Sequence, residues 1–426
     1  MKQIKNDKIN ETLYYEKLKN GLEVYLLKNP EETSIKISFA TKYGSMHNSF
    51  VPKNKKNYVD YPNGIAHFLE HKLFEMEDKE NALTQFQKKG VYVNAFTSKN
   101  ITAYYLVLTE NIEENVNDLL DFVQSPYFTD ENVEKEKGII SEEIKMWDDF
   151  PEEKLFDTLF LNTFVNHPYR NSIAGRIKDI KKITKEDLRD NYDVFYHPQN
   201  MFVVVTGNFD EKEILKIIKD NQNKKIFDPF NSIILKHIEE PSKVYKDKEI
   251  IKGNVEKTKI AINYKILISH LKIKPEKLEF YFNIILMNLF DKTSEINEKL
   301  KKLSVLTDGI KIDIDFVDNF SVWTIMAETE KPEELLKNIV KSMKNIKVTK
   351  EEFERKKKVL ISEFISHFNN LNGLNQKILF TKANFNIDFI SLFNLIEKLN
   401  YQELLKIIAK LDMSNKTVVI LETKNS

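Results

Sequence analysis

The chain has 426 residues, no cysteine, and equal numbers of basic and acidic side chains (65 each), so its formal net charge is zero. At roughly 100–200 residues per domain, this length predicts two or three domains. The neutral balance argues against a dedicated nucleic-acid-binding protein, which usually carries a basic patch. The absence of cysteine excludes disulfides, iron–sulfur clusters, thiol catalysis and thiolate zinc sites.

Two further classes of segment are missing from the sequence. The N-terminal stretch MKQIKNDKINETLYYEKLKN has no apolar region of the kind found in signal peptides. No uncharged apolar run reaches the roughly 18 residues that a membrane-spanning helix needs. We therefore expect a cytoplasmic protein that does not enter a membrane.

The predicted elements alternate between strands and helices. The first half of the chain is expected to contain a strand pair at 22–27 and 35–41, a helix at 65–76, and a hairpin of 91–96 (VYVNAF) and 101–108 (ITAYYLVL). Helical patterns follow at 112–124, 130–147 and 185–196, and then an apolar strand at 201–206 (MFVVVT).

The second half of the chain resembles the first. FTDENVEKEKGIISEEI, from Phe128, matches VTKEEFERKKKVLISEF, from Val348, at an offset of 220 residues. The similarity is weak in identity but consistent in element order. We predict an α+β protein with two homologous domains of mixed or antiparallel sheet packed with helices, at 1–225 and 253–426. A linker is expected at 226–252, where Lys, Asp and Pro cluster. Chance similarity between amphipathic helices is the alternative.

The segment GIAHFLEHKLFE holds His67 and His71, four residues apart on the predicted helix. At about 100° per residue the two lie on one face, about 40° apart, where two imidazoles can bind one zinc ion. Glu70 lies beside them, within reach of a water on such a zinc, as a general base would be. The order H-x-x-E-H inverts the common zinc-peptidase motif H-E-x-x-H. The alternative is a surface helix with two incidental histidines.

A third ligand is expected from the helix at 130–147. Glu136 and Glu143 are seven residues apart, and therefore about 20° apart around this helix. The apolar residues predicted to share their direction are Val133, Ile139, Ile140, Ile144 and Trp147. Carboxylates on an apolar face are costly unless they are paired or metal-bound. We interpret Glu143 as a ligand and Glu136 as a group that orients a ligand histidine. Bonds to core lysines or backbone groups are the alternative.

These residues together resemble the insulinase or pitrilysin family of zinc peptidases. The resemblance is carried by HFLEH, by the glutamate 72 residues after its second histidine, and by NAFTSKNITAYYL, and it is strongest over about 15–220. It implies two domains with a fold like that of mitochondrial processing peptidase. It also implies one Zn²⁺ per chain, with His67, His71 and Glu143 as ligands and Glu70 as the base.

The same resemblance implies a peptide-binding strand. Asn94 matches a substrate-contacting asparagine of the family. With Ala95 and Phe96 it would lie on an edge strand that pairs with extended peptide backbone. The alternative for Asn94 is an ordinary residue at a strand end.

The second half departs from the family pattern. Active members carry an Arg and a Tyr that help hold the substrate carbonyl. The corresponding segment here, 298–312 (EKLKKLSVLTDGIKI), has neither, and the only Arg after Arg189 is Arg355. At the offset of 220, HFLEH falls on MNLFD (287–291), so the second half has no copy of the metal site. The resemblance therefore favours a heterodimer in which a homologous, zinc-less subunit supplies Arg and Tyr. A homodimer is the alternative.

These features predict a zinc-dependent endopeptidase that cleaves peptides or unfolded polypeptide segments. The main alternative is a non-catalytic accessory or scaffold subunit that retains zinc, for example in a modification or assembly pathway. The missing Arg and Tyr favour that alternative, whereas Glu70 disfavours it because a structural zinc needs no base. A metal-dependent hydrolase of small molecules fits the predicted edge strand less well.

Overall fold

The computed structural model describes residues 1–77 and 80–424, and it divides into two compact units. Unit 1 comprises residues 1–144, 172–237 and 365–391, and unit 2 comprises 145–171, 238–364 and 392–426. Each unit is therefore assembled from both halves of the chain. Within the described residues, no helix is long and apolar enough to cross a membrane.

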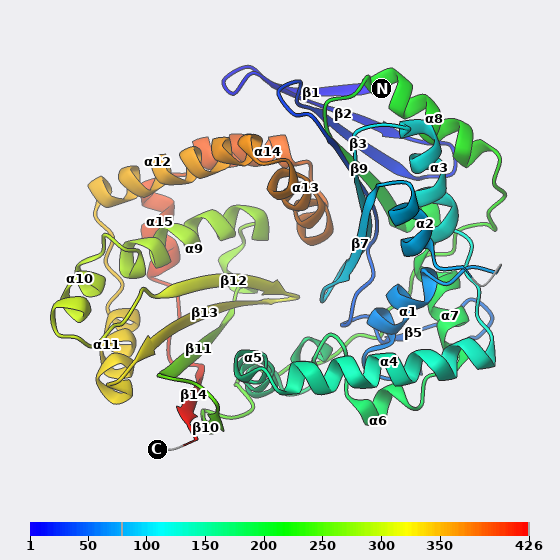
Figure 1. Cartoon of the computed structure of the whole chain (residues 1–426). Helices are drawn as coiled ribbons and strands as arrows, with labels where there is room; N and C mark the ends of the chain where they lie inside the picture. The colour runs from blue at the N-terminus through cyan, green and yellow to red at the C-terminus, as the bar shows by residue number, and fades with distance from the viewer. Residues whose placement is uncertain (78–79, 425–426) are drawn as a thin grey trace. The chain divides into compact units, whose positions relative to one another are not determined.

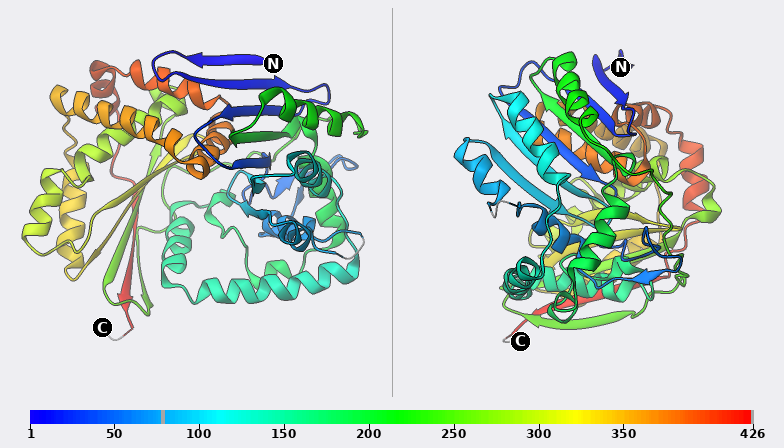
Figure 2. Two further views of the ribbon diagram at one scale, coloured as in Figure 1. Left: turned by 45° about the horizontal axis from the view of Figure 1, so that its top comes forward. Right: turned by 90° about the vertical axis from the view of Figure 1, so that its right-hand side faces the viewer.

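Unit 1 is built on a seven-stranded mixed sheet of order β1-β2-β3-β9-β4-β8-β7 (Figure 1). Its strands are β1 (Lys2–Asn6), β2 (Glu11–Lys17), β3 (Glu23–Lys28), β4 (Ile35–Thr41), β7 (Tyr92–Thr97), β8 (Thr102–Leu108) and β9 (Met201–Gly207), beside a separate pair of β5 (Ser49–Phe50) and β6 (Val59–Asp60). β1 and β2, dark blue in Figure 2, extend the sheet beyond β3. β7 is the opposite edge.

The two early strands exist as predicted, but their predicted pairing is wrong. β9 lies between β3 and β4, parallel to the first and antiparallel to the second. All seven residues of β9 are buried. A continuously apolar strand is stable where both faces of the sheet are covered. β9 therefore takes an interior position, although it is separated from β3 and β4 by more than 150 residues of sequence.

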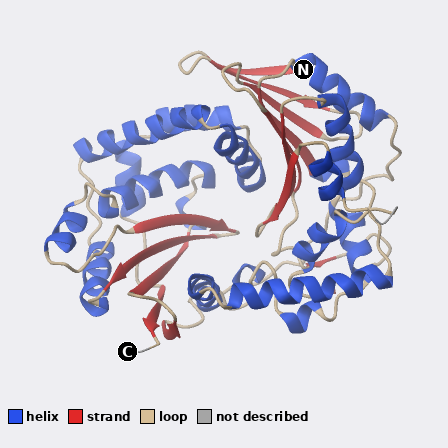
Figure 3. Cartoon of the chain, in the orientation of Figure 1, coloured by secondary structure: helices blue, strands red, loops and turns tan. Residues whose placement is uncertain are grey.

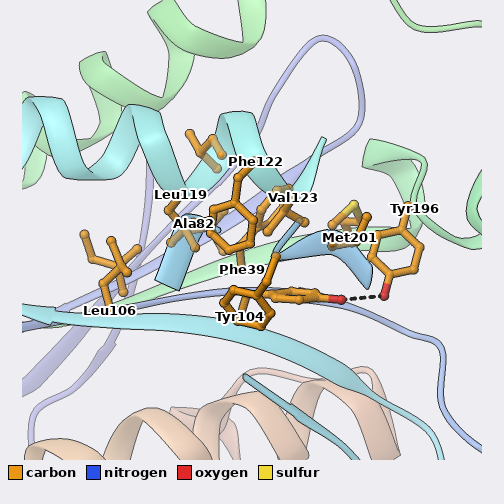
Figure 4. Close-up of a cluster of buried hydrophobic side chains, with 14 of the residues drawn as sticks. Phe39, Ala82, Tyr104, Leu106, Leu119, Phe122, Val123, Tyr196 and Met201 are labelled. Carbon is orange, nitrogen blue, oxygen red and sulfur yellow. Dashed lines mark hydrogen bonds between the residues drawn. The ribbon is translucent and has the colours of Figure 1, made fainter. Parts of the chain in front are cut away.

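The helices that pack on the sheet of unit 1 are α1 (Ile65–Leu73), α2 (Ala82–Lys88), α3 (Ile112–Val123), α8 (Glu211–Asn223) and α13 (Leu371–Phe385) (Figure 3). The unit also contains α4 (Asp130–Asp148, in this unit as far as Ile144), α6 (Ile177–Ile180) and α7 (Lys185–Phe195). The main hydrophobic core lies where α3 packs on the sheet. Figure 4 shows Leu119 and Phe122 of α3 above Phe39 and Tyr104, whose hydroxyl is 3.0 Å from that of Tyr196.

Unit 2 is built on a five-stranded sheet of order β10-β14-β11-β13-β12. Its strands are β10 (Lys248–Gly253), β11 (Thr258–Leu267), β12 (Lys311–Val317), β13 (Phe320–Thr329) and β14 (Lys416–Thr423). Its helices are α5 (Pro151–Thr163), α9 (Pro275–Phe290), α10 (Glu295–Lys302), α11 (Pro332–Lys344), α12 (Lys350–Ser366) and α15 (Tyr401–Ile408), with α14 (Phe389–Glu397) beginning in unit 1. Phe282 of α9 packs edge-on against the buried Trp323 of β13, with ring centroids 4.8 Å apart.

The predicted duplication is confirmed by the topology of the two sheets. Strands β3, β9, β4, β8 and β7 of unit 1 correspond in order to β10, β14, β11, β13 and β12 of unit 2. The first two strands of each series run parallel, and every later neighbour is antiparallel. The two sheets therefore share one fold of five strands, to which unit 1 adds β1 and β2.

The duplicated halves exchange one helix each. α5 and α13 begin at residues 151 and 371, the same offset of 220, yet each packs on the sheet built by the other half. Leu155 and Leu159 of α5 share a core cluster with β11 and β14. On α13, Asn375 is fully buried and bonds with Ser38 of β4 at 2.6 Å and Thr206 of β9 at 3.1 Å. The exchange explains why each unit contains segments from both halves.

Candidate metal centre

The first helix of the site, α1, presents two imidazoles one turn apart. It starts after Gly64, whose φ of 89° lies in the left-handed region. A Cβ at this position would also meet the Ala174 carbonyl oxygen at 2.4 Å, so glycine is required there. Phe68 and Leu69 are buried in the core, and the rings of His67 and His71 lie side by side with centroids 4.6 Å apart.

The second helix, α4, supplies the carboxylates. Val133, Ile140 and Ile144 are buried and hold α4 against the unit, and Glu136 is buried with them. Two of the residues predicted on this face, Ile139 and Trp147, are instead 48% and 42% exposed. The buried stripe is therefore narrower than the sequence pattern indicates. Ile139 lies at the edge of the predicted face, about 60° from Glu136, where a helix packed along a single line leaves side chains in solvent. Trp147 lies near the centre of that face, but in the last turn of α4.

Three donors from these helices converge. His67 Nε2 lies 3.8 Å from Glu143 Oε1, and His71 Nε2 lies 3.4 Å from Glu143 Oε2. One ligand atom from each residue lies within 4.8 Å of the other two. Zinc takes nitrogen and oxygen ligands at about 2.0–2.2 Å, which places two ligands of a tetrahedral ion roughly 3.4 Å apart. Two imidazoles and one carboxylate at these separations fit a zinc ion and leave a fourth position for water or substrate.

Glu136 lies behind His71 and orients it. Its Oε1 is 3.0 Å from His71 Nδ1. A carboxylate at Nδ1 favours the tautomer with hydrogen on that nitrogen, which leaves the Nε2 lone pair for a metal. Burial opposes charge on His71, but the hydrogen bond and the nearby carboxylates outweigh it and raise the pKa of His71. Burial lowers the pKa of His67 to about 4, which keeps this imidazole neutral, as a ligand must be.

Glu70 lies on α1 beside the donors and is buried. It is 7% exposed, and burial raises the pKa of its carboxyl group to about 7, against the lowering effect of Thr97 and His71. The Thr97 hydroxyl donates to Glu70 Oε2 at 2.5 Å. A carboxyl group with a pKa near neutrality is suited to take up and release a proton. Thr97 is not among the site residues predicted from the sequence, although alternation along β7 turns residues 93, 95 and 97 toward the same face of the sheet.

The segment predicted to bind peptide lies on β7, at the end of the strand order. Val93 and Ala95 face the core, whereas Asn94 is exposed. The Asn94 side-chain oxygen accepts a hydrogen bond from the Ala95 N–H at 2.8 Å. The Phe96 ring stacks on Phe380 of α13, with centroids 5.8 Å apart. Of the three predicted residues, Asn94 and Ala95 thus place a side-chain amide and a backbone N–H at the sheet edge. The Phe96 ring instead packs against α13.

The equivalent positions in unit 2 hold an ion pair. At the offset of 220, Asp291 corresponds to His71 and Lys356 to Glu136. The Lys356 ammonium group donates to Asp291, and only 1% of the lysine side chain is exposed. The pKa of Asp291 is lowered by this lysine, even though burial opposes the shift. In unit 2 an ion pair therefore joins the end of α9 to α12, where unit 1 has the hydrogen bond between His71 and Glu136.

Comparisons with known proteins agree with this geometry. The family model described as Insulinase (Peptidase family M16) matches residues 25–176, and the model described as Peptidase M16 inactive domain matches 182–360. The chain is 38% identical over 365 residues to the "Uncharacterized zinc protease YmfH" of Bacillus subtilis, covering 84% of this chain and 85% of that protein. It is 30% identical over 204 residues to the mitochondrial-processing peptidase subunit beta of Saccharomyces cerevisiae, covering 47% and 42% of the two chains.

Solved structures give the same assignment. The crystal structure of an M16-like peptidase from Alicyclobacillus acidocaldarius matches with a TM-score of 0.90 and 29% identity, over 97% of this chain and 99% of that chain. The duplicated fold, the inverted zinc-peptidase motif on α1 and these similarities identify the chain as a member of the insulinase family, peptidase family M16.

Proposed function

We propose that this chain is a zinc-dependent endopeptidase, with His67, His71 and Glu143 as the zinc ligands and Glu70 as the general base. The observation that carries the proposal is the convergence of three donors within 4.8 Å of one another, beside a buried carboxyl group of raised pKa. A structural zinc is usually enclosed by four protein ligands. Three ligands and an adjacent base are what a hydrolytic site requires.

Glu70 carries the proton transfers in this mechanism. When bound, zinc supplies Lewis-acid activation of the scissile carbonyl and of the attacking water. Glu70 accepts the proton that the water releases and passes it to the nitrogen of the leaving amine. Burial of Glu70 raises its affinity for that proton, so the group holds it long enough to deliver it. Glu136 holds His71 in place throughout.

The substrate is proposed to be a peptide or an unfolded polypeptide segment bound along β7. An extended chain can add to a free sheet edge through main-chain hydrogen bonds, which requires little of its sequence. The Ala95 N–H bonds to the neighbouring Asn94 side chain, and rotation of Asn94 would free this donor for a substrate carbonyl. The Asn94 amide would then be available to bond the substrate as well.

A second subunit is proposed to complete the site. Segment 298–312 contains no Arg or Tyr to stabilise the developing oxyanion. Arg170 donates to the carbonyls of Val165 and Leu161, and Arg355 pairs with Glu352, so both have structural partners. The yeast relative is named as a beta subunit, which supports a heterodimer whose zinc-less homologous subunit supplies these groups.

The test is to purify the chain, measure its zinc content, and assay cleavage of quenched fluorescent peptides by the chain alone and with a homologue that lacks H-x-x-E-H. We expect one zinc per chain and a large rise in rate on mixing. Full activity of the chain alone at a monomeric mass would refute the heterodimer, and full activity as a dimer of itself would replace it with a homodimer.

The non-catalytic alternative is favoured by one observation, the lack of Arg and Tyr in 298–312. An accessory or scaffold subunit would bind zinc but would cleave no peptide with any partner. Its zinc would contribute to stability, whereas the variant Glu70→Gln would leave its biological role unchanged. Zinc content, cleavage and complementation by this variant therefore separate the two functions.

A further inference from the structure

Two threonine hydroxyl groups of the β7–β8 hairpin form a short chain of contacts that ends at the proposed base. Thr97 ends β7, and its register partner Thr102 begins β8. The Thr97 hydroxyl is 2.5 Å from Glu70 Oε2 and 3.3 Å from the Thr102 hydroxyl. Thr102 is fully buried and donates to the Tyr43 carbonyl at 2.9 Å.

The number of hydrogen atoms that each group can donate decides which group is the donor in each contact. A hydroxyl group has one hydrogen to donate, and a carbonyl oxygen can only accept. The Thr102 hydrogen is therefore committed to Tyr43, so Thr102 cannot donate to Thr97. An ionised carboxylate also only accepts. The single hydrogen of Thr97 consequently goes to Glu70 Oε2, which is both nearer and charged, and hydrogen bonds to charged acceptors are the stronger ones.

We propose that Thr97 is a positioning residue for Glu70: it holds Oε2 and thereby reserves Oε1 as the oxygen that takes the proton from water and returns it to the leaving amine. This inference rests on the proposed peptidase function. The proton taken from water is the one delivered to the amine nitrogen, so the step needs no further reactant.

The position of Thr97 gives this hydrogen bond a second consequence. Thr97 belongs to the same strand as Asn94 and Ala95, which lie three and two residues before it along β7. A peptide bonded to the edge of β7 would be held at a fixed position relative to Glu70, because the strand itself is hydrogen-bonded to Glu70 through Thr97. The hydroxyl of Thr97 thus links the substrate-binding strand to the base, and its loss is expected to affect turnover more than binding.

The test compares Thr97→Val, which keeps the side-chain shape without the hydroxyl, with Thr97→Ser, which keeps the hydroxyl. Thr97→Val should lower kcat at least about tenfold, as expected for one hydrogen bond to a charged group. KM and zinc content should stay near the wild-type values, and Thr97→Ser should restore most of kcat. Equal loss in both variants, or loss of zinc in Thr97→Val, would refute a positioning role.

A second measurement does not depend on catalysis. Thr97→Val is made in the wild type and in Glu70→Ala, and thermal midpoints of the metal-free proteins are compared at pH 8. If Thr97 and Glu70 interact directly, Thr97→Val should lower the Tm of the wild type, and it should lower the Tm of Glu70→Ala much less. Equal shifts in both backgrounds would overturn the inference. If the wild type cleaves no peptide with any partner, the proposed function fails, and this coupling still decides whether Thr97 holds Glu70.

Discussion

Replacing Glu70 by Gln tests both the mechanism and the electrostatics of the site. Gln keeps the size of the side chain and an oxygen for the Thr97 hydroxyl, but it cannot take up a proton. The ligands His67 and His71 lie on the same helix and are untouched. We expect the variant to bind one zinc and to lose about 10²–10⁴-fold in kcat, the usual contribution of a general base.

The same substitution should change the stability of the metal-free protein in a pH-dependent way. Burial raises the pKa of Glu70 from 4.5 to about 7, so the folded state favours its neutral form. The resulting stabilisation is fully present below pH 4.5 and is lost as the pH rises through 7. At about 1.4 kcal/mol per pKa unit, the loss between pH 5 and pH 8 is about 2.5 kcal/mol. Gln carries no charge at either pH and escapes this loss.

The assay is urea unfolding of chelator-treated wild type and Glu70→Gln at pH 5 and pH 8, followed by far-ultraviolet circular dichroism. The variant should gain about 2.5 kcal/mol relative to the wild type between the two pH values. Added zinc should shrink the gain, because a nearby cation lowers the pKa of a carboxyl group. An unchanged kcat would refute the base assignment, and parallel pH profiles would refute the argument from burial.

Three further outcomes are expected. Glu136→Ala should weaken zinc binding about 10–100-fold by releasing a ligand histidine, measured by chelator competition, whereas the exposed Glu131→Ala should have no effect. Because burial lowers the pKa of His67 to about 4, the stability that this neutral imidazole provides above pH 6.5 should be lost as the pH falls through 4. In the variant His67→Asn, the free energy of unfolding of the metal-free protein should therefore fall less between pH 6.5 and pH 4. Asn375→Leu should destabilise the protein by about 2 kcal/mol through the polar groups it leaves unbonded, and an equal effect of the exposed Gln376→Ala in urea titrations would contradict this.

The sequence by itself determined the chemistry of the candidate site. His67, Glu70 and His71 occupy adjacent turns of one short helix, and Glu136 and Glu143 lie two turns apart on another, so helical periodicity alone places each group of side chains on one face. The apolar residues around them predict which face is buried. The duplication was also readable, because repeated helices keep their polar pattern even when few residues are identical.

The tertiary structure decided every feature that depends on contacts between distant segments. β9 separates β3 from β4, and α5 and α13 each pack on the sheet of the other half. The narrow buried stripe of α4 leaves Ile139 exposed, and Thr97 reaches Glu70 only because β7 lies against α1. Periodicity along the chain gives the direction of a side chain from its own helix or strand. The partner it meets is set by long-range packing of apolar surface, which the local pattern does not encode.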